Sequence, residues 1–177
     1  MSADARVAMM ASYNAWMNRR LYETAATLSH EALVADRGAF FGSILGTLNH
    51  LVVTDTIWLK RFAAAPDAPA VLAALDDTPM PTALDAMPYP TLPLLRERRE
   101  WLDALILQWA ATLTADRIAS SLIYTNTKGV SFTRGVLGLV THLFNHQTHH
   151  RGQITTLLSQ AGVDMGATDL VAMPDAE

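Results

Sequence analysis

The chain has 177 residues, a formal net charge of −4 and no cysteine. This length suits one domain over residues 1–177 that buries its core without disulfides. The absence of cysteine excludes thiolate metal sites and fits a reducing compartment, so we expect a cytoplasmic protein. The acidic balance argues against nucleic-acid binding. The most apolar stretch, residues 101–113, contains Asp103 and Gln108, so we expect neither a signal peptide nor a membrane span.

Apolar residues at helical spacing predict a first helix over residues 5–28. Val7, Met10, Met17 and Leu21 share one face of this helix, and Asn14 interrupts that face. A buried asparagine needs hydrogen-bond partners. Asn14 therefore either sets the register between helices or supports a metal site from outside the ligand sphere.

A second helix is predicted over residues 41–65, ending before Pro66. Asp55 interrupts its apolar face as Asn14 interrupts the first. Three roles for Asp55 remain open: it caps a neighbouring element, it orients an imidazole, or it lies solvated at the margin of the face.

Seven of the eight prolines lie in residues 66–93, which predicts an extended crossover along the bundle. A third helix is expected over residues 93–113. Its basic cluster of Arg96, Arg98 and Arg99 alternates with acidic residues, as on a solvated helix face.

Alternation around Asn126-Thr127-Lys128-Gly129 predicts a small β-hairpin over residues 122–133. A fourth helix follows over residues 133–161, and Gly162 stops it. The expected fold is all-α: four helices, a long crossover between the second and third, and a hairpin before the fourth.

The segment from Leu143 to Gln153 holds three of the six histidines. The fourth helix carries a buried stripe in which His146 and His150 occupy positions where leucines are expected: Leu139, Leu143, His146, His150, Ile154 and Leu157. Each imidazole could instead be a core histidine satisfied by its own hydrogen bonds. Two in successive turns favour a shared metal ion, because otherwise each needs a separate buried partner.

A third ligand must come from elsewhere in the chain. His30 lies in a polar stretch after the first helix and is expected at a helix end or in a loop. His50 lies inside the second helix, with Gly46 and Thr47 one turn earlier. These small residues would leave space for an ion, so we expect His50 to be the third ligand.

Three stretches carry a family resemblance: Tyr13–Leu21, Ser43–Leu51 followed by Asp55 and Trp58, and Asn145–Gln153. Through them the chain resembles the DinB/YfiT-like family of small bacterial metalloproteins. The resemblance implies a four-helix bundle of up-down-down-up topology and a divalent ion held by His50, His146 and His150. It also implies a homodimer, and some relatives resemble transferases or isomerases that use a low-molecular-weight thiol. The position of His149 is often aromatic in the family and is not a ligand, so His149 departs mildly from the pattern.

Three imidazoles without a thiolate leave an open coordination position, which is typical of a catalytic zinc site. Zinc or nickel is expected, although cobalt and iron accept the same ligands. We expect a metal-dependent hydrolase or thiol-dependent transferase that acts on a small molecule. The sequence identifies no catalytic residue: Asp55, Tyr13 and Tyr124 are candidate general bases only if the fold brings them near the ion. The alternative is a non-catalytic metal-binding or stress-response protein, and an apolar pocket opening onto the ion would favour the enzyme.

The fourth helix also carries a row of small and polar residues beside the buried stripe: Gly135, Gly138, His142, His149 and Gly152. Such a row permits close approach of another helix, so we expect this flank to take part in a homodimer. The alternative is that the hairpin or the crossover packs on it.

Overall fold

The computed structural model describes residues 2–174 as a mostly helical chain with one small antiparallel sheet. In chain order the elements are α1 (Ala3–Ala25), α2 (His30–Val34), α3 (Ile44–Ala63), the 3-10 helix η1 (Ala70–Leu75), α4 (Leu92–Thr112), α5 (Ala115–Ala119), β1 (Ser121–Thr125), β2 (Ser131–Gly135), α6 (Val136–Gln160) and the 3-10 helix η2 (Leu170–Ala172).

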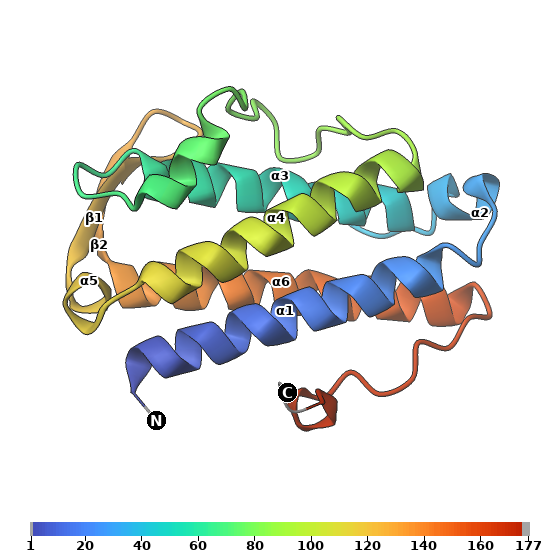
Figure 1. Cartoon of the computed structure of the whole chain (residues 1–177). Helices are drawn as coiled ribbons and strands as arrows, with labels where there is room; N and C mark the ends of the chain where they lie inside the picture. The colour runs from blue at the N-terminus through green and yellow to red at the C-terminus, as the bar shows by residue number, and fades with distance from the viewer. Residues whose placement is uncertain (1, 175–177) are drawn as a thin grey trace.

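The four longest helices lie side by side around a common core (Figure 1). Helices α1 and α6 run in one direction in this view, and α3 and α4 run in the other. Both α1 and α3 contact α4 and α6. These helices agree with the predicted ones to within a few residues at each end. The reason is that the apolar residues whose spacing predicts each helix form the face that packs into the core.

Local capping chemistry explains where these helices begin and end. The Ser43 hydroxyl accepts a hydrogen bond from the backbone N–H of Gly46 (3.0 Å) and caps the start of α3. Pro93 lies in the first turn of α4, where a missing N–H costs nothing. Gly162 follows α6 with φ of +80°, a conformation in which glycine pays no steric penalty.

The crossover is not extended throughout, so that prediction was wrong over η1. No proline lies between Pro69 and Pro79, and Pro69 itself has the φ of −62° that suits the start of a helical turn. Leu72 and Leu75 of η1 are buried, and burial of these side chains favours the turn. The short helices α2 and α5 were likewise not predicted.

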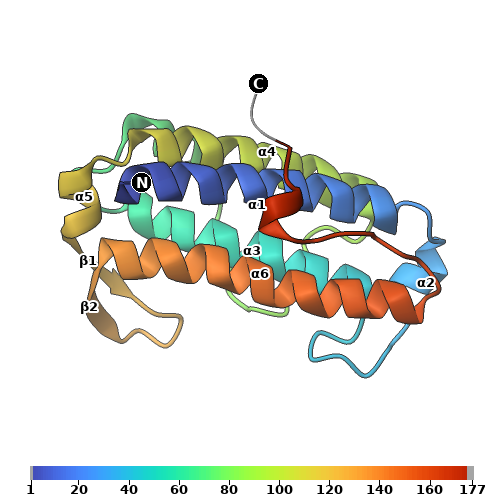
Figure 2. The same cartoon turned by 90° about the horizontal axis from the view of Figure 1, so that it is seen from below.

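The segment after α6 folds back across α1 (Figure 2). The Tyr13 hydroxyl donates to the carbonyl oxygen of Thr168 (2.5 Å), and Arg20 donates to the carbonyl oxygens of Met165 (2.9 Å) and Ala167. Side chains on the outer surface of α1 thus hold the tail by its backbone.

A layer of buried polar side chains lies between the long helices. The Arg99 guanidinium forms ion pairs with Asp55 of α3 (2.6 Å) and with Asp103 of α4 (2.9 Å). The Asp103 carboxylate also accepts hydrogen bonds from the Asn14 and Asn18 amides of α1, at 3.1 and 2.9 Å. Opposite charges held this closely offset much of the desolvation cost of burying them.

Two α6 residues that the sequence analysis did not single out complete this layer. The Gln147 amide donates to Asp55, and the Arg151 guanidinium donates to the Asn14 side-chain oxygen. Asn14 therefore connects helices, the first of its two expected roles, whereas Asp55 has none of its three. The expectation of a solvated face at Arg99 was also wrong, because its side chain is only 2% exposed.

Within residues 2–174, no helix is long and apolar enough to cross a membrane.

Candidate metal centre

The structure brings the three predicted imidazoles together. His50 lies on α3, and His146 and His150 lie one turn apart on α6. Their Nε2 atoms form a nearly equilateral triangle: His50 to His146 is 3.3 Å, His50 to His150 is 3.2 Å and His146 to His150 is 3.1 Å. Three ligand nitrogens therefore point at one another from two helices.

Hydrogen bonds at the opposite ring nitrogens determine which nitrogens carry protons. His50 Nδ1 lies 2.8 Å from the carbonyl oxygen of Leu84, which only accepts, so Nδ1 is the donor. His150 Nδ1 lies 2.7 Å from the side-chain oxygen of Gln153 and donates in the same way. Both neutral rings therefore turn an unprotonated Nε2 toward the centre of the triangle.

This arrangement fits a metal ion better than hydrogen bonds among the rings. The Nε2 atoms of His50 and His150 are both acceptors, so their 3.2 Å contact lacks a proton between them. Zn–N bonds measure about 2.0–2.1 Å, so two nitrogens at tetrahedral positions lie about 3.3 Å apart. The observed spacings of 3.1–3.3 Å match this value.

Burial keeps the three imidazoles neutral at physiological pH. Burial, together with the neighbouring rings of His150 and His50, lowers the pKa of His146 to about 3. Burial lowers the pKa of His150 to about 4, although its hydrogen bond to Gln153 acts in the opposite direction. The pKa of His50 is lowered as well, again by burial. Neutral imidazole is the form that binds metals, so the site needs no proton release on binding near neutral pH.

The loop before α3 covers one side of the triangle. The Phe41 ring stacks on His50, with ring centroids 3.8 Å apart, and meets His150 edge-on at 5.6 Å. Gly46 makes this possible, because a Cβ there would lie 2.2 Å from the Phe41 carbonyl oxygen. The interpretation of Gly46 as space for the ion was therefore wrong, since the Phe41 backbone occupies that space.

The remaining histidines lie outside the triangle. His30 is the exposed first residue of α2, as expected for a helix end. His149 is exposed, and its ring meets His150 edge-on at 4.8 Å. His142 is exposed one turn before His146, with ring centroids 5.7 Å apart. Within residues 2–174, only the three predicted histidines form a group with metal-ligand spacing.

Two of the three candidate bases are engaged elsewhere. Asp55 is buried in its ion pair with Arg99, and burial raises the pKa of its carboxyl group. The Tyr13 hydroxyl holds the C-terminal tail through Thr168. Tyr124 lies on β1 and packs against Trp58 of α3, with ring centroids 5.2 Å apart.

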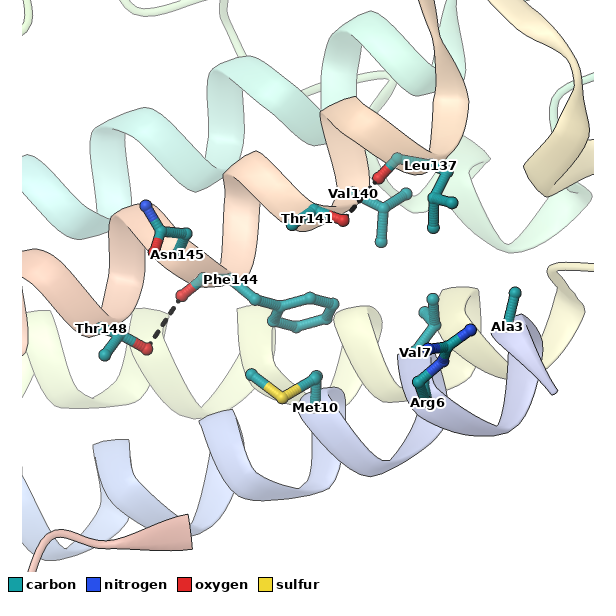
Figure 3. Close-up of a pocket in the computed structure, with 10 residues that line it drawn as sticks. All are labelled: Ala3, Arg6, Val7, Met10, Leu137, Val140, Thr141, Phe144, Asn145 and Thr148. Carbon is teal, nitrogen blue, oxygen red and sulfur yellow. Dashed lines mark hydrogen bonds between the residues drawn. The ribbon is translucent and has the colours of Figure 1, made fainter. Parts of the chain in front are cut away.

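A cavity of about 530 Å³ lies between the N-terminal halves of α1 and α6, away from the imidazoles. Phe144 and Met10 point into the space between the two helices (Figure 3). The hydroxyls of Thr141 and Thr148 donate to carbonyl oxygens of their own helix, at 2.7 and 3.1 Å. This cavity is mostly apolar and does not open onto the triangle.

A second cavity, of about 430 Å³, lies between the hairpin and the start of α6. It is lined by His142 and by Trp58, and the Trp58 ring lies 5.1 Å from the His142 ring. The imidazoles of the triangle do not line it. The apolar pocket opening directly onto an ion, which would favour an enzyme, is thus absent from the cavities described for residues 2–174.

Comparisons with known proteins agree with the resemblance seen in the sequence. The sequence model of the DinB family matches residues 1–177. Protein DinB of Bacillus subtilis (strain 168) is 28% identical over 159 residues, which cover 89% of this chain and 87% of that protein. No solved structure matches the chain. Because the match to the family extends over all 177 residues, the chain belongs to the DinB family.

Proposed function

We propose that His50, His146 and His150 together bind one divalent metal ion, with zinc or nickel as its identity. The triangle of Nε2 atoms carries this proposal, because two of the three rings are held with an unprotonated nitrogen facing its centre. The donor set is all imidazole, which suits zinc, nickel, cobalt and iron.

The reaction class that this site supports best is a metal-dependent hydrolysis or thiol transfer on a small molecule. With three protein ligands, a bound ion keeps an open position and supplies Lewis-acid activation to a group that reaches it. Phe41 shields one side of the imidazoles from water, and the Leu84 carbonyl oxygen holds the His50 ring in its orientation. The alternative function is non-catalytic metal binding in a stress-response dimer, which is favoured by the absence of the imidazoles from the neighbouring cavity.

The finer features of the fold belong to the same proposal. We infer one domain over residues 1–177, a four-helix bundle of up-down-down-up topology, a cytoplasmic location and a homodimer. The parallel run of α1 and α6 in Figure 1 supports this topology. The exposed row of α6, in particular its C-terminal part at His149 and Gly152, supports the dimer.

Metal content in single alanine variants tests the site. His50→Ala, His146→Ala and His150→Ala should each lower zinc occupancy sharply, because two imidazoles bind a divalent ion much more weakly than three. His30→Ala and His142→Ala are the controls and should keep the wild-type value. Equal zinc in all five variants would refute the ligand assignment.

The catalytic part needs a separate experiment. The protein loaded with cobalt should be screened with glutathione-like thiols and simple esters while the visible spectrum of the metal is followed. A change in coordination together with turnover supports an enzyme. If the protein binds the metal but shows neither turnover nor a spectral change with any of these probes, the non-catalytic alternative is supported.

A further inference from the structure

A cluster of aromatic and cationic side chains lies beside the candidate metal centre, where the end of α3, the hairpin and the start of α6 meet. It surrounds the 430 Å³ cavity, which is lined by Trp58, Tyr124, Arg134, Gly135, Gly138, Leu139 and His142. Figure 2 shows the hairpin and the loop before α3 projecting on the same side of the molecule, near opposite ends of α6.

His142 links this cavity to the metal centre. Its ring centroid lies 5.1 Å from that of Trp58 in the cavity wall and 5.7 Å from that of the ligand His146. His142 and His146 are one helical turn apart, about 5.4 Å along α6. A small molecule in this cavity therefore has to extend only about that far to approach the metal ligands.

The charged groups around the cavity are positive. Arg134 lines the cavity and lies over Phe132 at 5.2 Å. Arg61 is not part of the lining, but its guanidinium lies over two rings that are, Trp58 (4.6 Å) and Tyr124 (5.0 Å). Within residues 2–174, neither arginine forms an ion pair, whereas Arg99 and Arg117 do. Stacking on aromatic rings orients a guanidinium and leaves its N–H edge available.

Arg134 donates one hydrogen bond, to the carbonyl oxygen of Thr133 (2.9 Å), which leaves its other N–H groups for a ligand. Three further polar groups at the cavity have no protein partner. Among the described residues, no hydrogen bond involves the Trp58 indole, the Tyr124 hydroxyl or the His142 ring. Trp58 and Tyr124 are half-buried and line the cavity, so each offers it an apolar ring that carries one polar group. A few convergent donors on an aromatic wall are the usual lining of a small-molecule site.

We propose that this cavity binds the carboxylate-bearing part of the small molecule on which the metal centre acts. The apolar or unsaturated body of this molecule would lie against Trp58 and Tyr124, and its carboxylate would accept hydrogen bonds from Arg61 or Arg134. The other end of the molecule would point past His142 toward the metal ligands. This inference rests on the proposed function, because it assigns a substrate class to the same site.

The chain offers a matched pair of variants. Gly138 lines the cavity, and Gly152 lies further along the same exposed face of α6. A Cβ at either position meets no atom within 4 Å. Leucine at either position therefore removes a helix-destabilising glycine, and its Cβ meets no neighbouring atom. Only Gly138→Leu places a side chain in the cavity.

The test compares phenylacetate with its uncharged analogue phenylacetamide, using zinc-loaded protein and NMR of the Trp58 indole N–H, assigned through Trp58→Phe. Wild type should bind phenylacetate roughly ten-fold more tightly than the amide, as expected for one charge-assisted interaction of about 1.4 kcal/mol. The double variant Arg61→Gln with Arg134→Gln should lose this preference. Gly138→Leu should lose binding of both probes, and Gly152→Leu should retain wild-type binding.

Cobalt-loaded protein adds a measure of position. Cobalt is paramagnetic, so phenylacetate bound beside His142 should show faster proton relaxation than with the zinc form, and Gly138→Leu should abolish the difference. Equal affinities for the two probes, unchanged binding by Gly138→Leu, or no binding because a second copy covers the cavity would overturn the inference while leaving the metal centre intact. Failure to bind zinc or cobalt would instead overturn the proposed function. Binding of the two probes to the metal-free protein would then show whether the cavity still prefers the carboxylate.

Discussion

The Asp55 carboxylate of α3 and the Arg99 guanidinium of α4 form an ion pair of 2.6 Å in which both side chains are only 2% exposed. Arg99 also pairs with Asp103, so one cation serves two buried carboxylates. Gln147 ties α6 to the same Asp55 oxygen, between the metal-ligand candidates His146 and His150. The layer thus joins the helix that carries His50 to the helix that carries the other two imidazoles.

Replacing Arg99 by methionine should destabilise the protein strongly. Asp55 and Asp103 would be left buried without their cation, and breaking a buried pair in this way costs about 3–5 kcal/mol. Urea unfolding measures the loss. The control is Arg96→Met, which breaks the exposed pair with Glu100 and should cost at most about 1 kcal/mol. Equal losses in the two variants would show that the layer contributes no more than a surface pair.

Removing the metal should leave the fold intact. The core is built from apolar side chains of all four long helices, which pack without a bound ion. Chelation should therefore preserve the helical circular dichroism signal. The melting temperature should fall only moderately, because the protein loses no more than the stabilisation that metal binding contributes. Unfolding at room temperature on chelation would identify the ion as structural and count against an enzyme.

Gly46→Ala should weaken both stability and metal binding. The added Cβ would lie 2.2 Å from the Phe41 carbonyl oxygen. This oxygen belongs to the backbone, which cannot move aside as easily as the end of a flexible side chain. Overpacking of this kind costs about 1–3 kcal/mol, and the displaced loop would no longer stack Phe41 on His50. Gly152→Ala has open space around its Cβ and should be neutral or stabilising. Zinc affinity and urea unfolding of the two variants provide the comparison.

Acidification should destabilise the metal-free protein through His146. Its pKa is about 3 in the folded chain and about 6.5 in an unfolded one, so between these values the unfolded state binds the additional proton. The free energy of unfolding should therefore fall as the pH decreases from about 6.5 toward about 3. His146→Gln lacks this titration, so its stability should depend less on pH over the same range. Urea midpoints measured at several pH values test this, and identical pH profiles would contradict it.

The homodimer can be tested on the C-terminal part of the α6 row. Gly138 and His142 line the cavity beside the hairpin, whereas His149 and Gly152 are exposed without lining it. The wild type should therefore sediment as a dimer, and Gly152→Trp should shift the population toward monomers in sedimentation velocity, because a bulky side chain prevents the close approach of two helices. A wild type that sediments as a monomer at micromolar concentration would refute the dimer.

The sequence predicted the features that depend on local periodicity. The spacing of Leu139, Leu143, His146 and His150 places both imidazoles on one face, and the structure has them one turn apart, with His150 buried and His146 half-buried. His50 is predicted as the third ligand because it lies inside a helix, whereas His30 lies in a polar stretch. The fold brings the His50 Nε2 atom within 3.3 Å of the other two Nε2 atoms. A helical face follows from residues three and four apart, so one sequence is sufficient to predict it.

The sequence alone could not assign the partners of these residues. The sequence does not pair Asp55 with Arg99, because the two lie 44 residues apart and Arg99 stands in a charged cluster that is typical of a solvated helix face. The carbonyl oxygen of Leu84 that orients His50 belongs to a crossover without a periodic pattern. Phe41 is held over His50 because Gly46 admits its backbone. Backbone hydrogen bonds, close approaches and long-range ion pairs depend on how elements pack, and only the tertiary structure decides that packing.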